Sequence, residues 1–223
     1  MIRRPPRSTQ SRSSAASDVY KRQEVLWAFR EDNKLRQCWD ILGFIDEDAA
    51  KHGNIYCDAT VLGGFEWLEK SIPSDIKLIS GVGNPKTKKR FFEKSNHLGF
   101  GFCTLVAPDV KKSPYVEIDE GTIITAGNII TTQVKIGRQV TVNLNCTIGH
   151  DVIIEDYCTI APGVNISGNV KIREGAKLGT GVTVLPGLTV GRWSVVGAGG
   201  VVTRDIPDHV IAVGIPARVI RST

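Results

Sequence analysis

The feature that most constrains this chain is a hydrophobic residue that recurs every six positions between residues 106 and 207. Sixteen of these seventeen lead positions hold Val, Ile or Leu, and Lys112 is the exception. A period of six matches neither an α-helix nor a simple strand, whose side chains repeat about every 3.6 and 2 residues. It fits short strands joined by tight turns, in which three units make one coil and successive coils stack in parallel. We therefore expect residues 104–207 to form a three-sided parallel β-helix with the lead side chains inside.

The fifth position of each six-residue unit is usually small or branched, so it should also point into this prism. Cys146 and Cys158 occupy that position and are predicted to fill the core rather than to act as nucleophiles. The five cysteines are odd in number and never spaced C-x-x-C. This pattern argues against a disulfide framework or a zinc ribbon, and it favours a metal-free protein of the reducing cytoplasm.

The net charge of +5 lies entirely in the first 23 residues, which carry six basic side chains and one acidic one. The other 200 residues have 22 basic and 22 acidic groups, so a neutral body has no reason to bind a nucleic acid. No apolar run reaches the ~20 residues of a membrane span. The first 23 residues are Arg- and Ser-rich and resemble translated sequencing-adapter read-through. They are interpreted as a non-native, disordered tail.

Residues 24–103 alternate between predicted strands and helices, which is typical of an α/β domain with a parallel sheet. Ligands of such sheets bind at the carboxyl ends of the strands, where this chain has Asp46, Glu47 and Asn84. No strand precedes the first predicted helix after residue 23, so the domain is expected to be truncated and to lack its opening strand. Residues 208–223 form a short C-terminal segment.

Within the prism the only histidine is His150, in a predicted turn and followed directly by Asp151. Eighteen residues further on, Gly168 should lie on the same corner of the next coil, and strands of stacked coils lie about 4.8 Å apart. A neutral imidazole can accept a proton from an attacking group, and a free backbone N–H can stabilise an oxyanion. Asn143 is expected near the same edge. These residues predict an acyl-transfer site, with a solvated turn histidine as the alternative.

The other histidines (His52, His97 and His209) are expected to be solvated or structural. Trp193 falls in a predicted turn, where it could cap a neighbouring subunit or one edge of a cofactor.

The run V-N-L-N-C-T-I-G-H-D-V-I-I-E-D-Y-C-T-I-A-P-G-V-N-I-S-G-N-V resembles the sialic-acid O-acetyltransferase and UDP-4-amino-sugar N-acetyltransferase family (NeuD/PglD-like). The resemblance continues through V-G-A-G-G-V-V-T-R-D-I-P and V-G-I-P-A-R-V-I. It implies a Rossmann-like nucleotide-sugar-binding domain followed by a left-handed β-helix. It also implies a homotrimer that binds acetyl-CoA between adjacent prisms. A homo-oligomer is expected on physical grounds too, because one slender prism buries little apolar surface for the entropy it loses.

The same resemblance implies a role for each matching residue. His150 corresponds to the general base, Asp151 to the acid that raises its basicity, and Gly168 to the backbone donor to the acetyl group. The implied acetyl-CoA contacts are Thr180, Ala198 and Thr159, and the implied acceptor contacts are Asp46, Glu47, Asn84 and Asn143. Some relatives carry a second histidine where this chain has Thr159, and the family's opening strand and glycine-rich turn are missing.

These features predict an acetyl-CoA-dependent sugar acetyltransferase of surface glycan biosynthesis, but they leave N- and O-acetylation open. Carbonic anhydrases built on the same prism need three histidines for zinc, which this prism lacks. Other prism acetyltransferases lack the preceding α/β domain. A non-enzymatic scaffold or an inactive truncated homologue remains the alternative.

Overall fold

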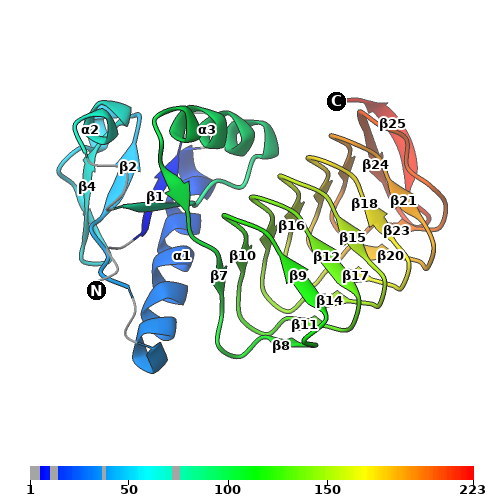
Figure 1. Ribbon diagram of the computed structural model, residues 1–223. Coiled ribbons are helices and arrows are strands. Elements are labelled where there is room, and N and C mark those ends of the chain that lie inside the picture. Colours follow the sequence, from blue (N-terminus) through cyan, green and yellow to red (C-terminus); the bar gives the residue numbers. More distant parts are fainter. Residues whose placement is uncertain (1–5, 11–14, 37–38, 72–75) are drawn as a thin grey trace. The chain divides into compact units, whose positions relative to one another are not determined.

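The computed structural model describes residues 6–10, 15–36, 39–71 and 76–223 (Figure 1). The chain divides into two compact units, Met1–Leu105 and Val106–Thr223. This division lies two residues from the boundary expected between residues 103 and 104. Each unit is described by itself below.

The first unit is an α/β domain around a six-stranded sheet with the order β3-β4-β2-β1-β5-β6. Every strand pair in this sheet is parallel except the β3–β4 hairpin. Its strands are β1 (Pro6–Gln10), β2 (Phe44–Asp46), β3 (Ile55–Tyr56), β4 (Ala59–Gly63), β5 (Lys77–Ser80) and β6 (Gly101–Phe102). Its helices are α1 (Ala15–Arg36), α2 (Phe65–Glu69) and α3 (Pro85–His97), and a 3₁₀ turn covers Ala49–Lys51.

The opening of the chain differs from the expectation of a disordered tail and a missing first strand. Residues 6–10 form β1 in the centre of the sheet, paired in parallel with both β2 and β5, and α1 begins at Ala15. Backbone hydrogen bonds hold a central strand whatever its side chains are. Pro6 is its first residue, where proline's missing N–H is tolerated. The expectation of disorder was therefore wrong for residues 6–10 and 15–23. The non-native origin of residues 1–23 stays a hypothesis.

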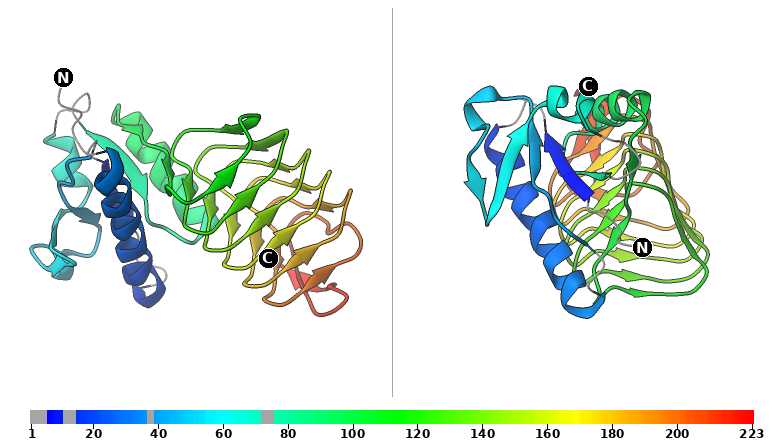
Figure 2. Two further views of the ribbon diagram at one scale, coloured as in Figure 1. Left: turned by 90° about the horizontal axis from the view of Figure 1, so that it is seen from below. Right: turned by 60° about the vertical axis from the view of Figure 1, so that its left-hand side comes forward.

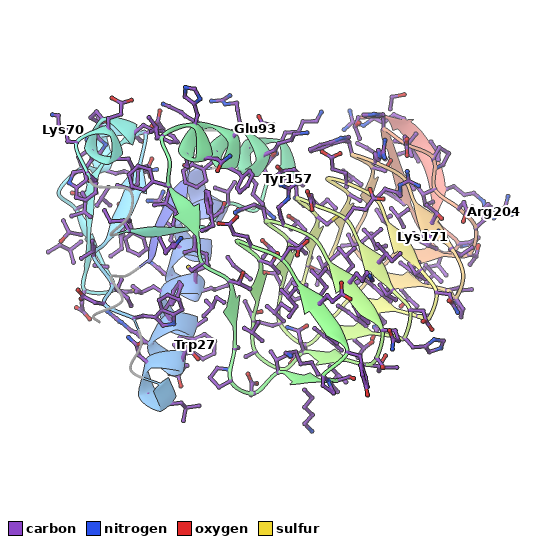
Figure 3. The ribbon with its side chains drawn as sticks, in the orientation of Figure 1. Trp27, Lys70, Glu93, Tyr157, Lys171 and Arg204 are labelled. Carbon is purple, nitrogen blue, oxygen red and sulfur yellow. The ribbon has the colours of Figure 1, made fainter. Side chains whose placement is uncertain are left out.

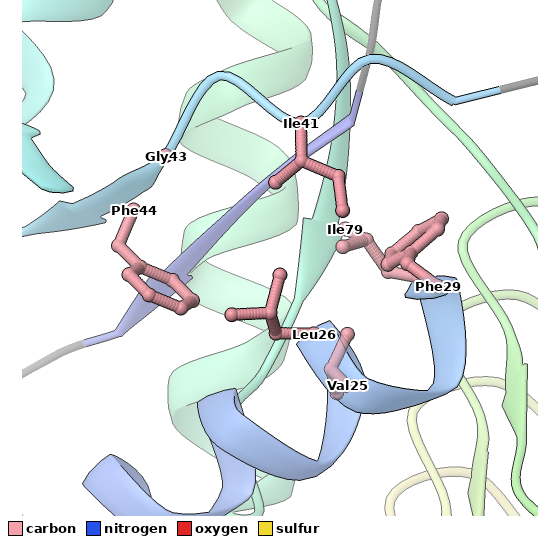
Figure 4. A pocket seen from close by; sticks show the side chains of 7 residues that line it. All are labelled: Val25, Leu26, Phe29, Ile41, Gly43, Phe44 and Ile79. Atoms are coloured by element: carbon pink, nitrogen blue, oxygen red, sulfur yellow. The ribbon is translucent and has the colours of Figure 1, made fainter. Parts of the chain in front are cut away.

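Helix α1 packs against the sheet through Val25, Leu26 and Phe29, each at most 3% exposed. Between these side chains and Ile41, Gly43, Phe44 and Ile79 lies a small apolar cavity (Figure 4). Its volume of about 10 Å³ is at the lower limit for one water molecule. This cavity is a packing gap and not a ligand pocket.

The second unit is the predicted parallel β-helix, in which successive coils stack along one axis (Figure 2). Each strand pairs with the strand 18 residues later, for example Thr147 with Asn165 and Asn165 with Thr183. The inward lead and fifth-position side chains form one continuous core. Cys146 and Cys158 are fully buried within it, as predicted.

Three parallel sheets form the faces of the prism. Face one contains β7 (Leu105–Val106), β10 (Ile123–Ile124), β13 (Thr141–Val142), β16 (Thr159–Ile160), β19 (Lys177–Leu178) and β22 (Val195–Val196). Face two contains β8 (Lys111–Lys112), β11 (Ile129–Ile130), β14 (Thr147–Ile148), β17 (Asn165–Ile166), β20 (Thr183–Val184) and β23 (Val201–Val202). Face three contains β9 (Val116–Ile118), β12 (Val134–Ile136), β15 (Ile153–Ile154), β18 (Lys171–Ile172) and β21 (Thr189–Val190).

The C-terminal segment adds the antiparallel pair β24 (Val210–Val213) and β25 (Arg218–Ser222) to face one. Residue β24 lies beside β22, so this hairpin closes the last coil and is not a separate tail.

The corners of the prism depend on residues with positive φ, which also recur every 18 positions. The corner between faces two and three uses Gln133, Asp151, Asn169 and Gly187. Asp151 has a φ of 58°, a conformation that Asp and Asn tolerate better than most residues. The corner spacing therefore follows the spacing of the strands, and it sets where the histidine turn lies.

Candidate active site

His150 lies on the corner that joins face two to face three, directly after β14. Its Nδ1 atom lies 2.8 Å from Oδ2 of Asp151. An ionised carboxylate only accepts hydrogen bonds, so Nδ1 carries the proton in this pair and Nε2 is left with a free lone pair. The His150 and Asp151 side chains are 58% and 52% exposed. The pair is therefore accessible to a ligand, with the basic nitrogen pointing away from its acidic partner.

Gly168 lies against the imidazole of His150, one coil further along the axis. A Cβ added to Gly168 would lie only 2.5 Å from Nε2 and 2.6 Å from Cε1. The neighbouring backbone groups are bonded across the coils: the Asn169 N–H donates to the His150 carbonyl, and the Gly187 N–H donates to the Gly168 carbonyl. The Gly168 N–H has no such partner among the described residues. A base and a free N–H donor thus lie side by side, as the 18-residue spacing predicted.

The residues implied to contact acetyl-CoA fall in other places. Thr180 and Ala198 stack on the corner that joins face one to face two, where the Gly199 N–H donates to the Thr180 carbonyl at 2.8 Å. Thr159 lies on β16 of face one and is only 5% exposed. Face two separates the Thr180 corner from the His150 corner.

Asn143 does not lie at the His150 corner. It follows β13 at the corner between faces one and two, it is 8% exposed, and its Nδ2 donates to the Ile160 carbonyl at 2.6 Å. The expectation that Asn143 shares the edge of His150 was wrong, because six residues of the coil place it one full face away.

The acidic residues of the first unit lie at the carboxyl end of β2, as predicted. Glu47 is exposed, and its Oε1 accepts a hydrogen bond from the Phe65 N–H at 3.2 Å. Asn84 is exposed too and caps the N-terminus of α3 by accepting from the Thr87 N–H. His52 is structural, since its Nε2 lies 2.8 Å from the Asp46 carbonyl oxygen.

Asp46, by contrast, is buried and fully engaged. Its Oδ2 accepts hydrogen bonds from Arg22 and, at 3.1 Å, from Lys51, while Oδ1 accepts from the Asp48 N–H at 2.9 Å. Burial raises the pKa of the Asp46 carboxyl, but the Asp48 N–H and the positive charges of Arg22 and Lys51 lower it more. The net result is a pKa below the ordinary value. Sequence reasoning missed both cations, because nothing in their local sequence indicates this pairing.

We expect Asp46→Asn to destabilise the first unit by about 3 kcal/mol, because it leaves the buried Arg22 without its counter-ion. A carboxyl with a lowered pKa stabilises the fold above its unfolded pKa of about 3.9, and this contribution is lost as the pH falls through the folded value. Urea unfolding at pH 7 and at pH 3 measures both effects.

The matched control is Asp58→Asn, since Asp58 is 92% exposed and lies 3.6 Å from Arg30. Its loss should cost no more than about 0.5 kcal/mol. Equal destabilisation by the two variants would contradict the structural role of Asp46.

Trp193 packs inside its own prism, since a Cβ added to Gly175, one coil earlier, would lie 2.3 Å from its ring. Tyr157 occupies the same corner one coil before Gly175 and is 6% exposed, whereas Lys171 projects outward from β18 (Figure 3). Both aromatic residues adopt positive φ, as this corner requires.

Across residues 6–10, 15–36, 39–71 and 76–223, no three His, Cys, Asp or Glu side chains come close enough to hold a metal ion. The four cysteines in this part of the chain carry free thiols. None of the helices that the structure describes has the length and hydropathy of a membrane span.

Comparison with known proteins places this arrangement among bacterial hexapeptide transferases. A family model described as "Bacterial transferase hexapeptide (six repeats)" matches residues 133–168. A segment of 28 residues is 64% identical to galactoside O-acetyltransferase of Escherichia coli. That segment spans 13% of this chain and only 14% of the curated relative.

Solved structures resemble the chain over almost its whole length. A mutant of perosamine N-acetyltransferase from Caulobacter crescentus, in complex with CoA and GDP-perosamine, has a TM-score of 0.84 at 26% identity, with 96% of each chain covered. The acetyltransferase domain of PglB from Neisseria gonorrhoeae has a TM-score of 0.83 at 26% identity, with 98% of this chain and all of that one covered. The predicted resemblance to hexapeptide-repeat sugar acetyltransferases is confirmed, and so is the fold class of an α/β domain followed by a left-handed β-helix.

Proposed function

We propose that this protein transfers an acetyl group from acetyl-CoA to a sugar, with His150 as the general base. The observation that carries the proposal is the position of His150, whose Nδ1 is held by Asp151 while Nε2 faces Gly168. The solved relatives support the substrates, since one of them was crystallised with CoA and the nucleotide sugar GDP-perosamine.

The chemistry is a direct transfer in one active site. The acceptor amine or hydroxyl attacks the thioester carbonyl and loses its proton to Nε2 of His150, forming the new N–C or O–C bond. The Gly168 N–H donates to the oxyanion that develops on the carbonyl oxygen. When this intermediate collapses, the C–S bond breaks and the CoA thiolate takes the proton back from the imidazolium. Asp151 stabilises the positive imidazolium between these two steps.

Acetyl-CoA is proposed to lie between adjacent prisms of a homotrimer, with its thioester at Gly168 and with further contacts at Thr180, Ala198 and Thr159. The separation of the Thr180 corner from the His150 corner supports a ligand that is long compared with one corner. The limited exposure of Thr159 makes it the weakest of these contacts.

The acceptor is proposed to be a nucleotide-linked amino sugar or a sugar hydroxyl, bound by the first unit through Glu47 and Asn84. Both side chains are exposed where parallel strands end, which is where ligands of such sheets bind. Asp46 belongs to the same edge, but it reaches a ligand only if Arg22 or Lys51 releases it. The four free thiols support a reducing compartment, the cytoplasm.

The proposal is tested by measuring free thiol released from acetyl-CoA in the presence of UDP-, GDP- and CMP-linked amino sugars and of free sugars. We expect thiol release with at least one acceptor and a decline in rate between pH 8 and pH 5, because a protonated imidazole cannot accept a proton. A protein that releases no thiol with any acceptor, or whose rate is flat over this range, would overturn the assignment of His150 as base.

A further inference from the structure

The outer surface of face two carries a polar pair that the proposed chemistry does not use. Its strands present Ile129, Thr147, Asn165, Thr183 and Val201 at equivalent positions, each followed by a buried lead residue. The members of this row therefore point outward. Thr147 and Asn165 are neighbours in it, and both are exposed.

These two side chains form a defined hydrogen-bonding unit. The Thr147 hydroxyl donates to Oδ1 of Asn165 at 2.7 Å, and Nδ2 of Asn165 donates to the Gly163 carbonyl at 3.2 Å. A hydroxyl keeps acceptor lone pairs after donating, and an amide nitrogen has a second hydrogen. The pair thus offers one acceptor and one donor side by side, which is the complement of a secondary amide.

The position of the pair relates it to the active site. Thr147 lies three residues before His150 on one coil, and Asn165 lies three residues before Gly168 on the next. Three extended residues span about 10 Å. In the other direction, face two begins at the Thr180 corner. A ligand that runs from Gly168 to Thr180 across this face must therefore pass Asn165.

We propose that Thr147 and Asn165 bind a secondary amide of a substrate, with the Asn165 N–H donating to the amide carbonyl and the Thr147 hydroxyl oxygen accepting from the amide N–H. This inference rests on the proposed function. Two substrates could supply the group: the pantetheine arm of acetyl-CoA, which contains two secondary amides, and an acceptor sugar that carries an acetamido group. The two residues position a substrate and take no part in proton transfer.

Two nearly isosteric variants test the proposal. Asn165→Asp removes the N–H donor, and Thr147→Val removes the hydroxyl but keeps a β-branched residue in the strand. Calorimetry with CoA and with adenosine 3′,5′-bisphosphate, which lacks the pantetheine arm, separates the arm from the nucleotide. The KM for an acetamido sugar and for the same sugar without that group tests the other source. Thr189→Val, on face three, is the control.

If the amide belongs to pantetheine, both variants weaken CoA binding about five- to tenfold and leave binding of the bisphosphate unchanged. If it belongs to the acceptor, CoA binding is unchanged and only the KM of the acetamido sugar rises by that factor. Unchanged affinities and KM values, with a lower melting temperature, would overturn the proposal and leave the pair as a cross-strand contact. A wild-type protein that neither binds CoA nor releases thiol would overturn the proposed function as well.

Discussion

Replacing His150 with alanine is expected to reduce kcat for acetyl transfer by about 10²- to 10⁴-fold, the range that a positioned general base contributes. The imidazole is the one group at this corner that can accept the acceptor's proton, and its exposed side chain supports no core packing. The melting temperature and the oligomeric state should therefore stay unchanged. Stopped assays of thiol release, together with thermal melting, measure both effects.

His97→Ala is the matched control for this experiment. His97 is also an exposed histidine, but it ends α3 in the first unit and has no acidic neighbour in the sequence. Its loss should leave kcat unchanged. If His150→Ala keeps full activity, the prism is a scaffold and the non-enzymatic alternative is correct.

Replacing Gly168 with alanine is expected to reduce kcat by about 10²-fold, although no reacting group is removed. The new methyl group would occupy the space of Nε2 and Cε1 of His150 and push the imidazole away from the reacting carbonyl. A misplacement of about 1 Å at a reacting group can cost this much. The His150 side chain is flexible and exposed, so it can move aside without disturbing the core, and the melting temperature should change little.

Gly163→Ala provides the opposite result and makes the comparison decisive. A Cβ added to Gly163 meets no atom within 4 Å, but its φ of 70° is strained for alanine by about 1 kcal/mol. This variant should lower the melting temperature and keep its kcat. A Gly168→Ala enzyme with normal kcat would show that the glycine is not needed beside the imidazole.

The six-residue period was sufficient to predict the β-helix and the pairing of its active-site residues. A shift of one residue would move every lead side chain from the core to the surface, so burial alone sets the register at 18 residues per coil. This register brings Gly168 over His150 even though the two are far apart along the chain. The prediction depended only on counting, because a repeat fold contacts its nearest neighbours in a regular way.

The first unit was predicted less well, because its structure depends on contacts between distant segments. Residues 6–10 have no strand-like side-chain pattern, and their place in the sheet comes from backbone bonds to β2 and β5. The engagement of Asp46 by Arg22 joins residues 24 positions apart and changes an expected substrate ligand into a buried ion pair. The β3–β4 hairpin was not predicted either.

The amino-acid sequence by itself determined the coil, its core and the alignment of His150 with Gly168, because a strict hydrophobic period leaves only one register in which the apolar side chains are buried. The tertiary structure alone decided how the imidazole is oriented by Asp151, which corner holds Asn143, and that the Gly168 N–H is free. These properties arise from side-chain rotamers and hydrogen bonds between coils, which a spacing in the sequence does not specify.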